Sequence, residues 1–222
     1  MLFFIIFKAA DVFKSVRGFF FEKIFKVYVM NIVLIGYRCS GKSLVGKILA
    51  DCLGLDLVDT DQVLERRVGC AVGDYVVENG WEAFRMLEKM VIRSISDFDR
   101  RVIATGGGAV LDWENVRNLK KTGWVVWLRA GISVIRERMA EDERSGFVRP
   151  GLSGESPMDE IEQVLSQRTA LYERACDYVA NTDQQSPDAV VKEIVQSLPE
   201  PIMPLPDGGA SPEMIRTAVL NP

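Results

Sequence analysis

The chain has 222 residues and a formal net charge of −4, with 48% hydrophobic and 26% charged residues. This composition indicates a globular protein of one domain with appendages, and it excludes a disordered or fibrous chain. The sequence contains no histidine, which excludes imidazole bases, Ser-His-Asp triads and histidine-bound metals. The acidic balance argues against a nucleic-acid partner. The four cysteines form no C-x-x-C pair, a pattern that predicts a reducing, cytoplasmic location.

Composition shifts at both ends of the chain. Residues 1–29 hold eight of the eleven phenylalanines, but their apolar run is far shorter than the roughly 20 residues that span a bilayer. We interpret this segment as a dispensable or non-native extension without stable membrane insertion; a membrane-surface or partner helix and an additional packed element are the alternatives. Residues 199–222 hold six of the nine prolines and are predicted to be a disordered tail. Residues 30–198 form the predicted globular domain.

Within this domain, strand and helix patterns alternate. In chain order, we expect a strand at 31–35, a helix at 42–53, a strand at 55–58, helices at 61–68 and 81–95, a strand at 101–104, a helix at 112–121, a strand at 124–128, a helix at 132–140, a mobile loop at 141–156, a helix at 157–176, a strand at 178–180 and a helix at 187–197. Alternation of this kind predicts an α/β three-layer sandwich with a central parallel sheet of about five strands. Ligands of such sheets bind at the carboxyl ends of the strands.

The first predicted strand runs directly into the pattern G-x-x-x-x-G-K-S, which opens the first helix. Its eight residues are Gly36, Tyr37, Arg38, Cys39, Ser40, Gly41, Lys42 and Ser43, and all of them except Tyr37 are candidates for binding the phosphates. Glycines let successive backbone N–H groups converge on a phosphate, and the helix N-terminus adds partial positive charge. Lys42 would bring a full charge to the β and γ phosphates, and the Ser43 hydroxyl is an oxygen ligand suited to Mg²⁺.

This pattern predicts nucleotide binding but leaves the reaction open. Three classes of protein use it. They are small-molecule or nucleotide kinases, guanine-nucleotide switches, and ATPase motors or nucleotide-binding interaction proteins. The sequence lacks the N-K-x-D segment that reads guanine. The third strand ends in Thr105 and three glycines, where motor ATPases usually carry an acid, and this weakens the third interpretation.

Two carboxylates follow the second predicted strand, at Asp59 and Asp61. They lie at the carboxyl edge of the sheet and, one residue apart on an extended chain, point in different directions. Asp59 is a candidate for the Mg²⁺ site and Asp61 for contact with an acceptor hydroxyl. The alternative is that one of them only caps the helix that begins near residue 61.

Further motifs follow in a fixed order. They are F-R-M-L-E at 84–88, the triple glycine at 106–108, Arg149-Pro150, and Arg168 followed by Tyr172. Together with the phosphate loop and the D-T-D triplet, this order and spacing resemble a shikimate kinase from about residue 31 to residue 197. The resemblance implies a P-loop fold like that of nucleoside monophosphate kinases, with a lid at about 141–156. It also implies ATP and shikimate as substrates, Mg²⁺ as cofactor, and a monomer.

The resemblance also implies site residues. Arg85 and Arg168 match the positions that clamp the acceptor carboxylate, and Asp61 matches the residue that holds the ring hydroxyls. Gly106, Gly107 and Gly108 match backbone that approaches the ring, where a Cβ would obstruct it. Arg149 matches the lid arginine over the transferring phosphoryl group.

One assignment from the family stays open. An arginine near the adenine is expected near the start of the lid, and both Arg138 and Arg144 qualify. Glu88 is one turn after Arg85 and is expected to orient it, while Phe84 is expected to wall the pocket. The alternatives are a kinase for another carboxylated polyol and a nucleotide-binding interaction protein that has lost transfer.

Overall fold

The structure is a computed structural model of the chain and describes residues 30–144 and 159–199. The site lies in the compact unit of Val29–Ser197. The predictions for residues 1–29, for most of the loop at 141–156 including Arg149, and for nearly all of the tail lie outside the described residues.

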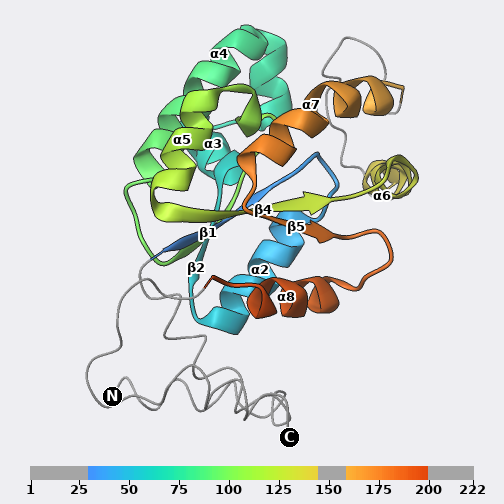
Figure 1. Cartoon of the computed structure of the whole chain (residues 1–222). Coiled ribbons are helices and arrows are strands. Elements are labelled where there is room, and N and C mark those ends of the chain that lie inside the picture. Colours follow the sequence, from blue (N-terminus) through green and yellow to red (C-terminus); the bar gives the residue numbers. More distant parts are fainter. Residues whose placement is uncertain (1–29, 145–158, 200–222) are drawn as a thin grey trace, which may run out of the picture. The chain divides into compact units, whose positions relative to one another are not determined.

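Five parallel strands form the sheet (Figure 1). They are β1 (Asn31–Ile35), β2 (Asp56–Asp59), β3 (Arg101–Ala104), β4 (Gly123–Arg129) and β5 (Tyr178–Asn181), in the order β2-β3-β1-β4-β5. In the register, Val33 of β1 pairs with Ile103 of β3 and with Val125 of β4. β1 is buried along its whole length, as expected for the centre of a sheet that is covered on both faces. The predicted fold class is confirmed.

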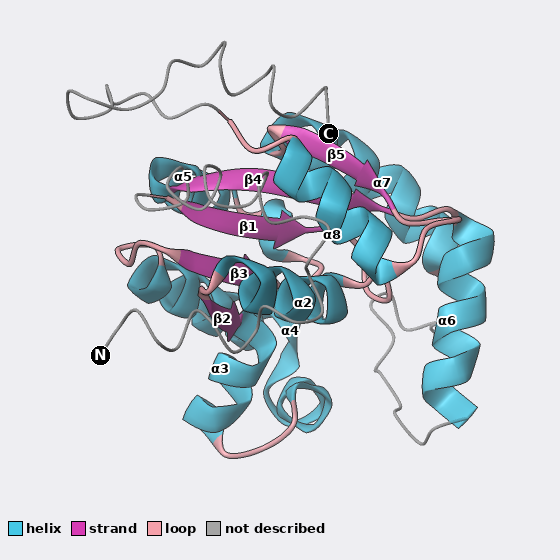
Figure 2. Cartoon of the chain, turned by 90° about the horizontal axis from the view of Figure 1, so that it is seen from below, coloured by secondary structure: helices cyan, strands magenta, loops and turns pink. Residues whose placement is uncertain are grey.

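Helices cover both faces of the sheet (Figures 1 and 2). On one face lie α2 (Lys42–Leu53) and α8 (Pro187–Gln196); on the other lie α4 (Val72–Ile95), α5 (Trp113–Thr122) and α7 (Ile161–Ala175). Alternate β1 residues serve the two sides. Val33 and Ile35 join the cluster that α4, α5 and α7 cover, whereas Leu34 faces Gly46 of α2, which leaves room for its side chain.

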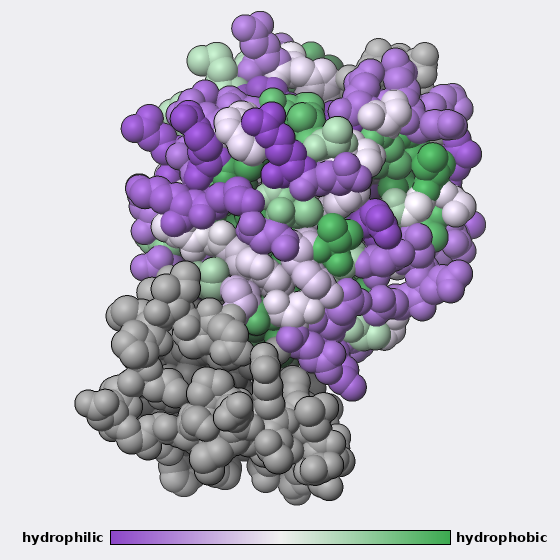
Figure 3. All heavy atoms as spheres, viewed as in Figure 1, coloured by the Kyte–Doolittle hydropathy of each residue, from purple (hydrophilic) through white to green (hydrophobic). Residues whose placement is uncertain are grey.

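The remaining elements lie at the carboxyl edge of the sheet. α3 (Thr60–Val68) follows β2 directly, a 3-10 turn η2 (Ala109–Leu111) follows the triple glycine, and α6 (Ile132–Arg144) follows β4. All three therefore begin at the edge where the phosphate loop lies. Among the described residues, no helix is both long enough and apolar enough to cross a membrane. The face seen in Figure 3 is mostly hydrophilic, with scattered apolar residues.

Three helix boundaries differ from the sequence-based expectation, and one of them is the start of α7, which begins at Ile161 rather than at residue 157. α4 begins at Val72 rather than near 81. It consists of two helical segments that meet at Gly80, whose φ of 81° and ψ of 165° are not helical, and the sequence-based expectation included only the second segment. α6 continues to Arg144, so the prediction of a loop from residue 141 was wrong for 141–144. Charge does not end a helix, since Glu and Arg are good helix formers, and Arg144 pairs with Glu141 one turn before it at 4.0 Å.

Candidate active site

The phosphate loop links β1 to α2. Gly36 has a φ of 145°, and a Cβ there would lie 2.5 Å from the Leu128 carbonyl oxygen, so only glycine fits. Gly41 caps α2 in a left-handed conformation with no side-chain hydrogen bond to the helix. Cys39 shares that conformation, with a φ of 60°. The first N–H groups of α2 are thus directed at the loop, an arrangement that suits an anion.

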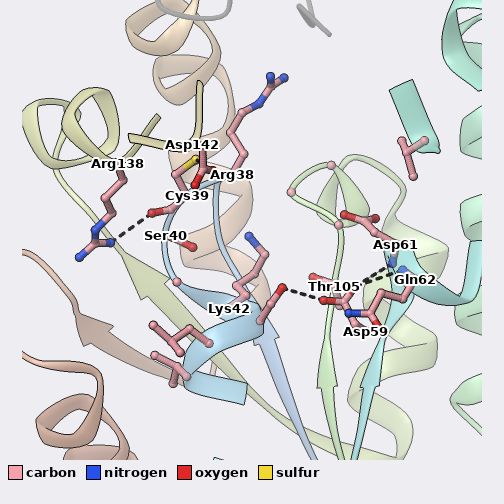
Figure 4. Close-up of a pocket in the computed structure, with 18 of the residues that line it drawn as sticks. Arg38, Cys39, Ser40, Lys42, Asp59, Asp61, Gln62, Thr105, Arg138 and Asp142 are labelled. Carbon is pink, nitrogen blue, oxygen red and sulfur yellow. Dashed lines mark hydrogen bonds between the residues drawn. The ribbon is translucent and has the colours of Figure 1, made fainter. Parts of the chain in front are cut away.

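Lys42 lies within this loop (Figure 4). The residue is 9% exposed. Its Nζ donates to the carbonyl oxygens of Gly36 at 2.9 Å and Tyr37 at 2.7 Å. These bonds curl the loop around the ammonium group. The lysine charge therefore adds to the partial positive charge of the helix N-terminus.

Asp59 faces the loop from the end of β2. Its Oδ2 accepts a hydrogen bond from Ser43 Oγ at 2.7 Å. Its Oδ1 accepts from the backbone N–H groups of Asp61 at 3.0 Å and Gln62 at 3.3 Å, so Asp59 is the N-cap of α3. Asp59 can therefore cap the helix with one oxygen and still present the other to Ser43, where the sequence analysis expects a Mg²⁺ site. The cap is Asp59 and not Asp61.

Asp61 and Glu88 flank the first glycine of the turn at 106–108. A Cβ on Gly106 would lie 2.8 Å from Asp61 Oδ1 and 2.7 Å from Glu88 Oε1, so the two carboxylates come close together. The Gly106 N–H donates to Thr60 Oγ1 at 2.9 Å, which ties this turn to the start of α3. Glu88 is 1% exposed, and burial raises the pKa of its carboxyl despite the attraction of Arg85.

Arg85 is held in place by its neighbours on α4. Its Nη1 donates to Glu88 Oε2 at 2.6 Å, in the expected (i, i+3) pair. Its guanidinium carbon also lies 5.2 Å from the Trp81 ring centroid and 5.1 Å from that of Phe84, and these two rings pack edge to face. A cation between aromatic rings and a buried carboxylate has little freedom. Trp81 was not among the predicted residues, although its position one turn before Arg85 was visible in the sequence.

Arg168 reaches the same turn from α7. It is 7% exposed, and its Nη1 donates to the Gly107 carbonyl oxygen at 3.2 Å. The Tyr172 hydroxyl donates to the same oxygen at 2.6 Å. On the other side of the turn, the place of a Cβ on Gly108 is filled by the Arg85 guanidinium. Gly106 and Gly108 thus leave room for the site's own side chains, whereas a Cβ on Gly107 would lie 3.2 Å from the backbone nitrogen of Arg38 in the phosphate loop. The sequence-based prediction considered only the ring of the acceptor and did not include these reasons.

An ion pair of Arg38 and hydrogen bonds of Arg138 connect the phosphate loop to distant parts of the chain. Arg38 pairs with Glu160 just before α7 at 3.2 Å, and the Glu160 side chain is fully buried. Arg138 of α6 donates to the Cys39 carbonyl oxygen at 3.1 Å and to the Thr182 carbonyl oxygen at 2.7 Å. Glu160 was missed by the sequence analysis, because nothing local connects it to a partner so far away along the chain.

Most of these groups line one cavity of about 940 Å³. Of the site residues predicted in the described part of the chain, all but Gly36 and Arg144 line it. Of the two candidates near the adenine, Arg138 lines the cavity, whereas the Arg144 side chain is 73% exposed and pairs with Glu141. The arrangement places an anion cradle beside two guanidinium groups and a carboxylate, which suits transfer of a phosphoryl group to an acidic acceptor.

Comparison with known proteins agrees with this chemistry. A family model described as shikimate kinase matches residues 38–199. The chain is 40% identical over 170 residues to a shikimate kinase of Nitratidesulfovibrio vulgaris, covering 77% of this chain and 95% of the relative. It is also 40% identical over 166 residues to that of Thermodesulfovibrio yellowstonii, covering 75% and 93%.

Solved structures give the same result. A shikimate kinase from Acinetobacter baumannii in complex with shikimate superposes with a TM-score of 0.71 at 30% identity, covering 78% of this chain and 95% of that one. The fold, the order of the motifs and both sequence comparisons agree, and the resemblance seen in the sequence is confirmed. The chain belongs to the shikimate kinase family.

Proposed function

We propose that this protein transfers the γ-phosphoryl group of ATP to the 3-hydroxyl of shikimate, giving shikimate 3-phosphate on the route to chorismate and the aromatic amino acids. One observation carries the proposal: Arg85, Arg168 and Asp61 meet around the glycine turn in the cavity that the phosphate loop also lines. Shikimate offers one carboxylate and three hydroxyls. Guanidinium groups bind a carboxylate through paired hydrogen bonds, and an aspartate accepts hydrogen bonds from hydroxyls.

The phosphate side of the site neutralises charge. In phosphoryl transfer the transition state is loose, so positioning and electrostatics outweigh the strength of any base. Lys42 and the amides of the loop hold the β and γ phosphates, and the family resemblance assigns the same task to Arg149 over the transferring group. Arg138 stands on the far side of the loop, where it supports the nucleotide.

The residues at the junction of loop and sheet suit a magnesium ion. Mg²⁺ takes oxygen ligands, and the Ser43 hydroxyl and an Asp59 carboxylate oxygen lie 2.7 Å apart at the mouth of the loop. We infer that Ser43 holds the ion, with Asp59 supporting it. When bound, the ion offsets negative charge on the phosphates.

The acceptor side orients the hydroxyl. Arg85 and Arg168 hold the acceptor carboxylate, while Asp61 bonds to the ring hydroxyl that reacts. The bond from this hydroxyl oxygen to the γ-phosphorus forms as the bond from that phosphorus to ADP breaks. The hydroxyl proton passes to the Asp61 carboxylate late in the transfer.

An assay of ADP release separates the possible acceptors. The full chain is given MgATP with shikimate, gluconate or a nucleoside monophosphate, and the product is identified by phosphorus NMR. We expect turnover with shikimate alone. Turnover with gluconate would identify a sugar-acid kinase, and ATP binding without turnover an interaction protein; each would contradict the proposal.

A matched pair of lysine variants checks that the turnover belongs to this site. Lys42→Met removes the charge inside the loop, so we expect it to abolish turnover. Lys47→Met changes an exposed lysine of the same helix, and its activity should match that of the wild type.

A further inference from the structure

The Gly107 carbonyl oxygen is held by two donors from one helix. The Tyr172 hydroxyl lies 2.6 Å from it and Arg168 Nη1 lies 3.2 Å from it. The two residues are four apart on α7, so they share a helix face. Arg168 has a place in the proposed function, whereas Tyr172, which the sequence motif also contains, has none so far.

The anchored carbonyl determines where the next N–H points. In a trans peptide, the C=O and the following N–H point in opposite directions, and the described chain contains no cis peptide. Because the Gly107 oxygen points to α7, the Gly108 N–H points away from that helix. Beside Gly108 lies the Arg85 guanidinium. The orientation of the peptide between Gly107 and Gly108 therefore decides whether the Gly108 N–H lies next to Arg85, the arginine that faces the acceptor.

The tyrosine is itself held firmly. It is 1% exposed, and its ring stacks on Trp127 of β4 with 5.6 Å between ring centroids and an interplanar angle of 18°. The hydroxyl is therefore fixed relative to the sheet. Burial raises the pKa of Tyr172 to about 12, so the hydroxyl keeps its proton and remains a donor at neutral pH.

We infer that Tyr172 is a positioning residue for the acceptor: with Arg168, it sets the direction of the peptide between Gly107 and Gly108, so that the Gly108 N–H and the remaining Arg168 donors face the acceptor. Its hydroxyl acts through the Gly107 carbonyl. The inference rests on the proposed function, because it needs an acceptor bound at this turn.

The test is Tyr172→Phe, which removes the hydroxyl and keeps the ring on Trp127. The hydrogen bond that is lost lies inside the protein. If the peptide then loses its direction, acceptor binding must restore it, and the net contribution of one hydrogen bond sets that cost at about three- to tenfold in affinity. We expect the KM for shikimate to rise by that factor, while the KM for ATP and kcat stay within about twofold of the wild type. The melting temperature of each variant is measured in parallel.

The chain offers a matched control. Tyr178 also stacks on a tryptophan of β4, Trp124, with 5.5 Å between centroids, and its hydroxyl donates to Glu193 Oε1 at 2.9 Å. It does not line the described cavity. Tyr178→Phe therefore repeats the chemistry of the substitution away from the turn, and its kinetic constants should equal those of the wild type.

The outcomes are distinct. If the wild type turns over shikimate and Tyr172→Phe has an unchanged KM for it, the inference is wrong although the function stands. Parallel losses in both KM values, kcat and the melting temperature would show that Tyr172 is only structural. A wild type without shikimate turnover would overturn both proposals.

Discussion

A methyl group at residue 108 should weaken acceptor binding without unfolding the protein. The place of a Cβ on Gly108 is filled by the Arg85 guanidinium, so Gly108→Ala must displace that group. The backbone permits alanine, since φ is −104° and ψ is 2°, values open to residues other than glycine. Arg85 is held by the rings and by Glu88, but its side chain is 26% exposed, so a displaced guanidinium can enter solvent. Glu88, whose pKa is raised by burial, can then take up a proton and stay neutral. We therefore expect a melting temperature within a few degrees of the wild type.

The size of the effect follows from what Arg85 loses. A hydrogen bond to a charged group contributes about 1.5–3 kcal/mol, which corresponds to a factor of roughly 10–150 in affinity. The displaced guanidinium also leaves the two rings of Trp81 and Phe84. We expect the KM for shikimate to rise on the order of 10–100-fold in steady-state kinetics, with the KM for ATP unchanged.

A double-mutant cycle isolates the cause. In an Arg85→Ala background the space beside residue 108 is empty, so adding Gly108→Ala should change the KM for shikimate little further. Additive effects of the two substitutions would mean that they act independently. A Gly108→Ala enzyme whose KM for shikimate stays within twofold of the wild type would refute the reasoning.

Three other substitutions test separate parts of the site. Asp61→Asn should lower kcat on the order of 10²–10⁴-fold with a normal melting temperature, because it removes the group that orients the hydroxyl; near-normal kcat would remove Asp61 from the mechanism. Ser43→Ala should raise the Mg²⁺ concentration needed for half-maximal activity, and an unchanged requirement would place the ion elsewhere. Burial raises the pKa of the Glu88 carboxyl above its ordinary value of 4.5. The stability that the protonated Glu88 gives the folded state is therefore fully present below pH 4.5 and is lost as the pH rises through the raised pKa. In urea titrations between these two pH values, the wild type should lose stability relative to Glu88→Gln, and parallel pH profiles of the two proteins would contradict this.

Local signals made the strands and the phosphate loop predictable. β1 is an uninterrupted apolar run, and the loop that follows needs only its own glycines, lysine and serine. The arginines and the glycine turn were assigned through the family motif alone, since their convergence depends on how α4, α7 and β3 pack. The D-T-D triplet offered two possible caps, and only the direction of the backbone after β2 decides between them.

Other parts of the site depend on contacts between distant residues. Arg138 meets the Thr182 carbonyl 44 residues away, and Arg38 meets Glu160 across most of the domain. Neither contact has a periodicity or spacing that a single sequence displays. The start of α4 was missed for a different reason: the non-helical Gly80 divides the segment, so that the apolar pattern before it is too short to be read as a helix.

Asp59 contacts two neighbouring parts of the site, the N-terminus of α3 and Ser43 of the phosphate loop. Any residue that starts a helix well, such as Asn or Ser, would satisfy α3, whereas the carboxylate also places negative charge beside Ser43. In the proposed function, this one side chain therefore connects the ion site at Ser43, through Oδ2, to the backbone that carries Asp61, through Oδ1.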